Sequence, residues 1–426
     1  MGVRRETQLE ATRAAAEYQR MWFAEMRKEV FESKSPYAIV QADMPLELFE
    51  VMGLPVISNQ WWAALISAKK LSGEYLDGLN AQGFHKGLCR YCALGFASSV
   101  VATESTAPWG GLPRPALIGA RLTCDCIQRV FYNWSQFFQA KLIVLDNTGS
   151  QVMPPRWWEL SRYRWRELFE SDRLDHMVAE FRPLIQVIEE VTDSTFDEDK
   201  LRELMAAVNQ QEEYFEEVRQ LICDAPQTPV RMREQVNNVM TCQWHRGSDW
   251  AVIHARAFRD EVKARVESGI AAFPGEELRL MWIGAGMWHD LDFYTDFEDS
   301  HGAVFVWSMY LAFGPDGYIR YGLDDPLRAL ASRTISMNEQ LHNPPWVNEW
   351  MLEQARLHRI DAVVMLMPLG TKPSATGTIF TARTLEAAGI PVLTLASDMA
   401  DERAWNGPEM RLRVNTFLDT RVIRQS

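Results

Sequence analysis

The stretch from residue 87 to residue 126 decides how this chain is organised: GLCRYCALGFASSVVATESTAPWGGLPRPALIGARLTCDC. It contains four of the 6 cysteines of the chain, namely Cys89, Cys92, Cys124 and Cys126. Thiolates that come in pairs are the ligands that soft metals and iron–sulfur clusters require. The alternative interpretation is that these residues are small buried hydrophobic side chains, as most free cysteines are.

The spacing within each cysteine pair limits the site that they can form. Cys89 and Cys92 have the two-residue separation that is common in zinc and iron–sulfur half-sites. Cys124 and Cys126 are one residue apart, so on a helix their side chains would point about 200° apart. All four thiols therefore converge only if Cys124 and Cys126 lie at a strand end or in a turn. A thioredoxin-like redox pair is disfavoured, because no clear strand–helix unit of that kind follows Cys92.

Length and composition predict an ordinary globular protein. The chain has 426 residues, which predicts two or three domains. Its net charge is -13 and its pI is near 5.2, which argues against a nucleic-acid partner and against an anionic membrane surface. No apolar run is long enough to cross a bilayer, and the charged N-terminus does not read as a signal peptide. We therefore expect a cytoplasmic protein with reduced thiols.

Predicted strands and helices alternate on both sides of a helical middle part. Short apolar runs predict strands at 37–40, 55–58, 115–120, 141–146, 279–284, 303–306, 361–367 and 389–395. Helical patterns cover 5–33, 62–80, 126–139, 157–220, 229–267, 377–388 and 407–420. The predicted fold class is α/β, with two parallel-sheet lobes of the Rossmann or flavodoxin type joined by a helical connector. The predicted domains are 1–35 (N-terminal helix), 36–155 (first lobe), 156–275 (connector) and 276–426 (second lobe).

The predicted strand 115–120 places the cysteines at a functional edge. It ends just before Cys124, and ligands in open α/β sheets bind at the carboxyl ends of the strands. Two facing lobes make a cleft, and the cysteines would point into it. The sequence has no P-loop, no GxGxxG after a strand and no HExxH, so nucleotide hydrolysis and metalloprotease chemistry are not indicated. Cys223 and Cys242 are isolated, and we interpret them as structural.

The order of these features resembles the core subunits of the 2-hydroxyacyl-CoA dehydratase and benzoyl-CoA reductase family over most of the chain. GLCRY at residues 87–91 resembles the first cysteine segment of that family. LTCD at 122–125 resembles the second segment, which is the more specific motif. The stretch GIPVLTLASDMADER at 389–403 is similar to the closing strand and acidic turn of the family.

One position departs from the family pattern. In the turn PLGTKP at residues 368–373, Thr371 stands where the family has its third cysteine. A threonine hydroxyl is a poor ligand for cluster iron, which prefers thiolate. Either Cys92 or Cys126 supplies the missing ligand, or this subunit has lost its cluster. The presence of four thiolates in one stretch favours the first possibility.

The resemblance implies radical chemistry on a CoA thioester. The implied cofactor is a [4Fe–4S] cluster, whose candidate ligands in this chain are Cys89, Cys92, Cys124 and Cys126. The implied partners are a homologous core subunit and an ATP-hydrolysing activator that has its own interface cluster. The chain has 16 tryptophans, most of which we interpret as packing, and this content favours an aromatic acyl-CoA substrate. The preferred function is a benzoyl-CoA reductase that reduces the ring to a cyclic diene. The alternatives are a 2-hydroxyacyl-CoA dehydratase that uses a ketyl radical, and a cluster-free structural partner.

Four further residues are candidates for the same site. His85 lies just before the first cysteine segment, and His289 follows the predicted strand 279–284 after a short glycine turn. Either histidine could donate a proton near neutral pH. Arg121 and Lys372 are candidates for binding the CoA phosphates. The alternative for all four is an ordinary surface or structural role.

Overall fold

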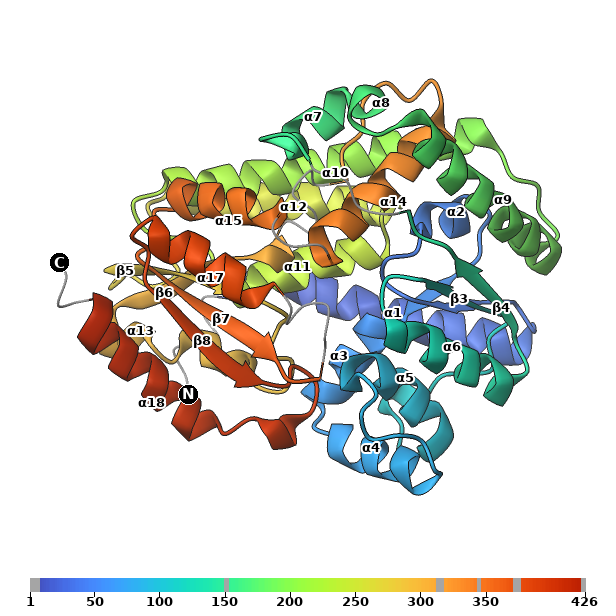
Figure 1. The fold of residues 1–426 in the computed structure, drawn as a ribbon, viewed down its shortest axis with the longest axis horizontal. Coiled ribbons are helices and arrows are strands. Elements are labelled where there is room, and N and C mark those ends of the chain that lie inside the picture. The colour runs from blue at the N-terminus through green and yellow to red at the C-terminus, as the bar shows by residue number, and fades with distance from the viewer. Residues whose placement is uncertain (1–7, 149–152, 312–317, 343–345, 371–376, 423–426) are drawn as a thin grey trace.

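The computed structural model describes residues 8–148, 153–311, 318–342, 346–370 and 377–422 (Figure 1). It contains two parallel sheets of four strands, which confirms the predicted α/β fold with two lobes. The first sheet has the order β2-β1-β3-β4, formed by β1 (Ala38–Val40), β2 (Val56–Ser58), β3 (Leu117–Arg121) and β4 (Lys141–Leu145). The second has the order β6-β5-β7-β8, formed by β5 (Leu278–Ile283), β6 (Ala303–Ser308), β7 (Ala362–Pro368) and β8 (Val392–Ser397).

Both sheets have the same connectivity, and that connectivity creates a binding edge. In each sheet the chain runs outward from the first strand to its neighbour and then returns to the other side of the first strand. The direction therefore reverses between β1 and β3 in the first sheet and between β5 and β7 in the second. In parallel sheets a ligand crevice opens at the carboxyl ends of the strands at such a reversal. Strands β3 and β6 are buried along their whole length, as expected for strands covered on both faces.

Helices alternate with the strands in both halves of the chain. Those of the first lobe are α1 (Glu10–Glu32), α2 (Leu46–Val51), α3 (Asn59–Ala68), α4 (Ser72–Ala81), α5 (Arg90–Val101) and α6 (Asp125–Phe138). Those that follow β5 in the chain are α13 (Glu298–His301), α14 (Pro326–His342), α15 (Trp346–Leu357), α17 (Thr378–Ala387) and α18 (Gly407–Phe417). The helix predicted at 62–80 is in fact two helices, α3 and α4. The break occurs at Lys70, whose backbone is left-handed with φ 56°, and no glycine or proline marks it in the sequence.

The middle of the chain is helical, as predicted, and joins the two lobes. Its helices are α7 (Trp157–Tyr163), α8 (Trp165–Leu168), α9 (Ser171–Thr192), α10 (Glu198–Asp224), α11 (Met232–Trp244) and α12 (Asp249–Glu267). Helix α10 packs on α12, α1 packs on both α11 and α12, and α14 packs on both α9 and α10. Figure 1 shows α11 between the two sheets, α7 and α8 at the top of the view, and α9 beside the first sheet. No helix in the described ranges has the length and apolar character needed to span a bilayer.

Most of the aromatic content lies in the core. The largest fully buried side chains include six tryptophans: Trp62, Trp134, Trp157, Trp165, Trp282 and Trp307. They fill the layers between sheets and helices, so their number says little about the substrate.

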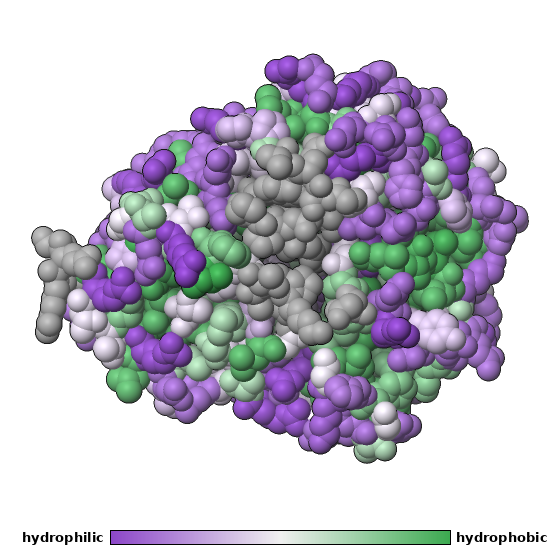
Figure 2. Space-filling model, viewed as in Figure 1, coloured by the Kyte–Doolittle hydropathy of each residue, from purple (hydrophilic) through white to green (hydrophobic). Residues whose placement is uncertain are grey.

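Hydrophobic side chains reach the surface beside the open edge of the first sheet. Strand β4 is the outer strand of that sheet, and its Leu142 and Ile143 are only half-buried. On the neighbouring helix α6, Tyr132 and Phe137 are exposed. Figure 2 shows hydrophobic residues gathered on this side of the molecule. Exposed areas of this kind are common where proteins associate.

Buried Glu212 on α10 gives a first testable prediction. Gln211 and Gln243 donate hydrogen bonds of 3.1 and 2.6 Å to its Oε1, and burial raises its pKa to about 7. Because the folded-state pKa lies above the unfolded one, stability is lost as the pH rises through about 7. We expect Glu212→Gln to increase the free energy of unfolding at pH 8 by roughly 1–3 kcal/mol and to change it little at pH 5. Urea unfolding at both pH values tests this, with Glu203→Gln on the exposed face of α10 as the control.

Candidate functional site

The four cysteines of the opening stretch come together at the beginnings of two helices. Cys89 immediately precedes α5 and Cys92 is its third residue, while Cys124 immediately precedes α6 and Cys126 is its second residue. The Cys92 thiol is within hydrogen-bonding reach of the other three sulfurs, and Cys126 also contacts Cys89. The backbone N–H of Cys89 donates to Cys126 Sγ at 3.2 Å. The structure thus brings the four together, and their role as cluster ligands stays a prediction.

The turn between β3 and α6 explains how the closely spaced pair can converge. Strand β3 ends at Arg121, and Cys124 is still extended, with φ -153° and ψ 157°, before α6 begins at Asp125. The two cysteines of this pair therefore straddle a strand-to-helix turn instead of sharing one helix. This is the geometry that their spacing requires if both thiols are to reach the other pair.

Cys124 is the thiol of this group that most readily carries a negative charge. The hydrogen bond from the Cys92 thiol lowers the pKa of Cys124 against the opposing effect of burial, and the backbone N–H groups of Ile127 and Cys126 lower it further. Those N–H groups belong to the first turn of α6, where a helix favours an anion. The hydrogen bond to Cys124 raises the pKa of Cys92 well above its ordinary value, and the hydrogen bond to Cys89 raises that of Cys126 to about 12.

The donor set fits an iron–sulfur cluster in its chemistry. Among the described residues, no group of three or more His, Cys, Asp or Glu side chains is arranged to hold a single metal ion. A four-iron cluster is larger than one ion, so thiols in mutual contact would have to move apart around it. Such clusters are bound by cysteine thiolates. The site offers four free cysteines, and the lowered pKa of Cys124 favours its thiolate form.

The second lobe contacts the cysteine site through ion pairs with Arg90, the residue after Cys89 in the first lobe. Arg90 forms ion pairs with Asp398 at 3.5 Å and with Asp401 at 3.4 Å. Asp398 follows β8, and its carboxylate also accepts the backbone N–H groups of Ala400 and Asp401 at 2.9 Å. Figure 1 shows the ends of β7 and β8 directed at the helices of the first lobe. The carboxyl edges of both sheets therefore meet at the cysteine site.

Tyr91 lies beside the cysteines and meets aromatic residues of the second lobe. Tyr91 lies between Cys89 and Cys92 in sequence, and burial raises the pKa of its phenol well above the ordinary value. Its phenol lies near Trp288 and Tyr310 of the second lobe, whose rings are 5.5 Å apart in an edge-on arrangement. Sequence reasoning missed these three residues. The sequence offers two weak signals for them: Tyr91 lies next to a cysteine, and Trp288 and Tyr310 each lie soon after a predicted strand.

Asp43 is a further residue that sequence reasoning missed. It follows β1, and its Oδ2 accepts hydrogen bonds from Gln41 Nε2 at 2.6 Å and from Thr123 Oγ1 at 3.3 Å. Thr123 immediately precedes Cys124, so this carboxylate braces the turn that presents the cysteine. A polar cluster directly after a short buried strand is the signal that could have identified it.

The remaining predicted residues lie in different surroundings. His85 is exposed, and its Nδ1 accepts the Gly87 N–H at 2.9 Å, so a neutral ring carries its proton on Nε2. His289 is buried, which lowers its pKa, and its Nε2 lies 3.2 Å from the Asp398 carbonyl oxygen. Arg121 is fully buried, donates to Asp43 O and Asn147 Oδ1, and has its pKa lowered to about 10 by burial. Thr371 and Lys372 lie outside the described residues. The predicted roles of these residues stay predictions.

Gly95 lets α5 approach its neighbours closely enough to form the site. A Cβ at this position would lie 2.2 Å from Asn59 Oδ1 and 2.5 Å from a ring carbon of Trp134 on α6. Asn59 Nδ2 also donates to the Cys92 carbonyl oxygen at 3.1 Å, so this contact supports the cysteine turn.

We therefore expect Gly95→Ala to lower the free energy of unfolding by roughly 1–3 kcal/mol and to lower the iron content. Thermal unfolding measures the first effect and iron analysis the second. An exposed helical glycine would instead be stabilised by alanine, so a gain in stability would contradict this packing argument.

Comparison with known proteins agrees with this geometry. Residues 41–420 match the family model described as 2-hydroxyglutaryl-CoA dehydratase, D-component. The lactoyl-CoA dehydratase subunit alpha of Anaerotignum propionicum is 22% identical over 392 residues, covering 88% of each chain. The (R)-2-hydroxyisocaproyl-CoA dehydratase alpha subunit of Clostridioides difficile is 21% identical and covers 93% of each chain. The (R)-phenyllactyl-CoA dehydratase alpha subunit of Clostridium sporogenes is 22% identical, covering 90% of this chain and 89% of that protein.

The three relatives bear on the choice between the predicted functions. All of them are named as alpha subunits of 2-hydroxyacyl-CoA dehydratases, so they favour the dehydratase alternative over the preferred ring reductase. The family resemblance read from the cysteine segments and the closing strand is confirmed by the match over most of the chain. The chain belongs to the 2-hydroxyglutaryl-CoA dehydratase D-component family.

Proposed function

We propose that this chain is the alpha-type core subunit of a heteromeric dehydratase that eliminates water from a 2-hydroxyacyl-CoA thioester. We further propose that it holds a [4Fe–4S] cluster through Cys89, Cys124 and at least one of Cys92 and Cys126. The observation that carries the proposal is the convergence of four thiols at the edge where the two lobes meet. The family membership and the names of the relatives support the reaction type.

The ligand set in this proposal comes from the first lobe alone. Position 371, where the family has a cysteine, is a threonine in this chain. Cys92 and Cys126 contact the other two thiols and offer the sulfur that Thr371 lacks. When bound, the cluster supplies the single electrons that reduce the thioester.

The surrounding residues have distinct tasks in this proposal. Tyr91, Trp288 and Tyr310 form an aromatic wall that keeps water from the thioester. The ion pairs of Arg90 hold the second lobe against the cysteines. The neutral His289 ring donates through Nε2 to the Asp398 carbonyl, which leaves Nδ1 as the atom that accepts a proton.

The burial of several tryptophans weakens the reason for preferring an aromatic substrate. That preference rested on the number of tryptophans, and six of them are fully buried packing residues. The required partners are a second core subunit and an ATP-hydrolysing activator. The exposed hydrophobic residues beside β4 offer a surface on which a subunit could pack.

Anaerobic purification with the co-expressed partner subunit tests the proposal. We expect iron and acid-labile sulfide in equal amounts, close to four of each per chain, as a [4Fe–4S] cluster requires. With activator and ATP, the complex should dehydrate at least one of lactoyl-CoA, phenyllactyl-CoA and 2-hydroxyglutaryl-CoA and should leave benzoyl-CoA unchanged. Turnover without iron in this chain would identify it as a cluster-free partner. Reduction of benzoyl-CoA would restore the ring-reductase assignment.

A further inference from the structure

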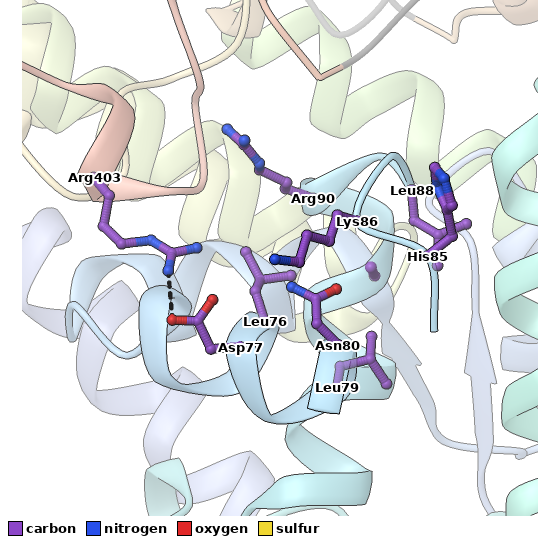
Figure 3. A pocket seen from close by; sticks show the side chains of 10 residues that line it. Leu76, Asp77, Leu79, Asn80, His85, Lys86, Leu88, Arg90 and Arg403 are labelled. Carbon is purple, nitrogen blue, oxygen red and sulfur yellow. Dashed lines mark hydrogen bonds and ion pairs between the residues drawn. The ribbon is translucent and has the colours of Figure 1, made fainter. Parts of the chain in front are cut away.

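A separate cavity of about 120 Å³ opens next to the cysteine site (Figure 3). It is bounded by α4, the start of α5, the loop between them and η4 (Glu402–Ala404) of the second lobe. Leu88 and Arg90 line it, and these residues flank Cys89. Because neighbouring helix residues point about 100° apart, the cavity lies on the face of α5 next to the one that carries the cysteines.

The walls of this cavity are unusually cationic for a chain with a net charge of -13. Lys86, Arg90 and Arg403 line it, against a single carboxylate from Asp77. Arg403 is held firmly, by Asp77 at 2.8 Å and by both carboxylate oxygens of Asp401. The ion pairs of Arg90, at 3.5 and 3.4 Å, are longer than hydrogen bonds and leave its N–H groups available.

Lys86 provides the charge that the protein itself does not neutralise. In the described part of the chain its ammonium has no carboxylate partner. Figure 3 shows its side chain extending across the cavity above Asn80, toward the pair formed by Arg403 and Asp77. Leu76, Leu79 and Leu88 supply apolar walls beside this ammonium. Lys86 is exposed, so water screens its charge, and an anion in the cavity would be held by the ammonium together with the guanidinium groups of Arg90 and Arg403.

The size of the cavity restricts what it can hold. Sites for drug-sized ligands are commonly about 300–1,000 Å³, so this one is too small for a nucleotide and suits one small group. A CoA thioester carries anionic oxygens at two places, in the phosphates of CoA and, for some acyl chains, in a terminal carboxylate. Ammonium and guanidinium groups donate strong hydrogen bonds to both.

We propose that this cavity binds an anionic group of the thioester substrate, a CoA phosphate or a carboxylate at the end of the acyl chain, with Lys86 as the main counter-charge. The proposal rests on the proposed function for the identity of the ligand. Because Arg403 belongs to the second lobe, the subsite is complete only when the two lobes are in contact.

Isothermal titration of the anaerobically purified complex tests the subsite directly. The probes are CoA, 3′-dephospho-CoA, lactoyl-CoA and 2-hydroxyglutaryl-CoA. Lys86→Glu should weaken the binding of the relevant probes by about tenfold or more, because a charged hydrogen bond is replaced by repulsion. Lys86→Arg should stay within about threefold of the wild type, since it keeps the charge. Lys69→Glu, the same charge reversal at the end of α3 outside the cavity, is the matched control.

The pattern across the probes identifies the anion. Weaker binding of CoA, lactoyl-CoA and 2-hydroxyglutaryl-CoA in Lys86→Glu indicates a CoA phosphate. If 3′-dephospho-CoA also binds more weakly to the variant, the group is the diphosphate; if 3′-dephospho-CoA binds wild type and variant equally, and as weakly as the variant binds CoA, the group is the 3′-phosphate. If Lys86→Glu binds only 2-hydroxyglutaryl-CoA more weakly and binds the other three probes like the wild type, the group is the acyl carboxylate. If Lys86→Glu binds all four probes like the wild type while the complex dehydrates its substrate, the subsite is wrong and the proposed function stands. If no substrate is dehydrated but Lys86→Glu still loses CoA, the function is wrong and the subsite stands.

Discussion

Replacing Cys124 with alanine should remove the iron from the anaerobically purified subunit and abolish turnover. Cys124 is the thiol with the lowered pKa, set by the hydrogen bond from Cys92 and by the N–H groups that begin α6. A cluster ligand binds as thiolate, so the loss of this residue removes the group already prepared for the metal. The measurements are iron and sulfide per chain, the visible absorption of the cluster and the rate of dehydration.

The matched control for Cys124 is a cysteine outside the site. Cys223 lies near the end of α10 and contacts none of the four clustered thiols, and its pKa is raised to about 11, chiefly by burial. Cys223→Ala should keep its iron and its activity. Iron and turnover retained in Cys124→Ala would contradict the cluster assignment. A folded Cys124→Ala protein, shown by circular dichroism unchanged from the wild type, excludes unfolding as the cause of the loss.

The same assay decides how the chain replaces its missing third cysteine. If Cys92 or Cys126 is the substitute, alanine at that position should lose iron, while Thr371→Cys should change the iron content little. Both thiols contact the other members of the group, which is why we expect one of them to be required. Iron present in the wild type and unchanged in both alanine variants would show that neither thiol is the substitute.

The strands could be predicted from the sequence because each one forms from a short run of consecutive apolar residues. The short apolar run before Cys124 is buried along its whole length in the structure, whereas β4, predicted from a similar run, is half-buried at its centre. The break at Lys70 was missed because helical periodicity continues across it. Cysteine spacing predicted the turn before α6, since geometry left few ways for the thiols to meet. The pairing of Arg90 with Asp398 was out of reach, because the two residues are far apart in sequence and neither lies in a periodic pattern.

Asp43 and Tyr310 illustrate the same limit at the site itself. Each follows a strand, so sequence places both near a carboxyl edge, but only the packing of one lobe on the other brings them near each other. The sequence therefore predicts which edge of a sheet carries function better than it predicts which residues meet across two sheets. The packing of the lobes in turn depends on buried charges, which sequence patterns do not reveal.

Glu47 is the centre of the buried charges that hold the lobes together, and replacing it with alanine should strongly destabilise the protein. Its carboxylate on α2 contacts Arg246 of the connector at 3.0 and 3.3 Å and Arg333 on α14 at 3.4 Å. All three side chains are almost completely buried. Removing the carboxylate leaves two buried guanidinium groups without their anion, which costs about 3–5 kcal/mol. Urea unfolding at pH 7 measures this loss.

The pH dependence separates this charge effect from simple loss of packing. Burial alone would raise the pKa of Glu47, but Arg246 and Arg333 hold it below its ordinary value. A lowered folded-state pKa stabilises the protein above the unfolded pKa of about 4.3, and this stabilisation disappears as the pH falls through the folded-state value. The difference between wild type and Glu47→Ala should therefore be large at pH 7 and shrink at pH values below about 4.

Two further variants complete the test. Glu47→Gln keeps the size of the side chain and loses its charge, so it should show most of the loss at pH 7 and the same convergence at low pH. As the control, Glu203→Ala on the exposed face of α10 should change stability by less than about 0.5 kcal/mol at both pH values. A Glu47→Ala loss that is equal at pH 7 and pH 3.5 would mean that packing, and not the charges, is responsible. If the charges do hold the lobes in place, the variant should also bind iron less well at pH 7, because Asp43 and the cysteine turn belong to the lobe that Glu47 anchors.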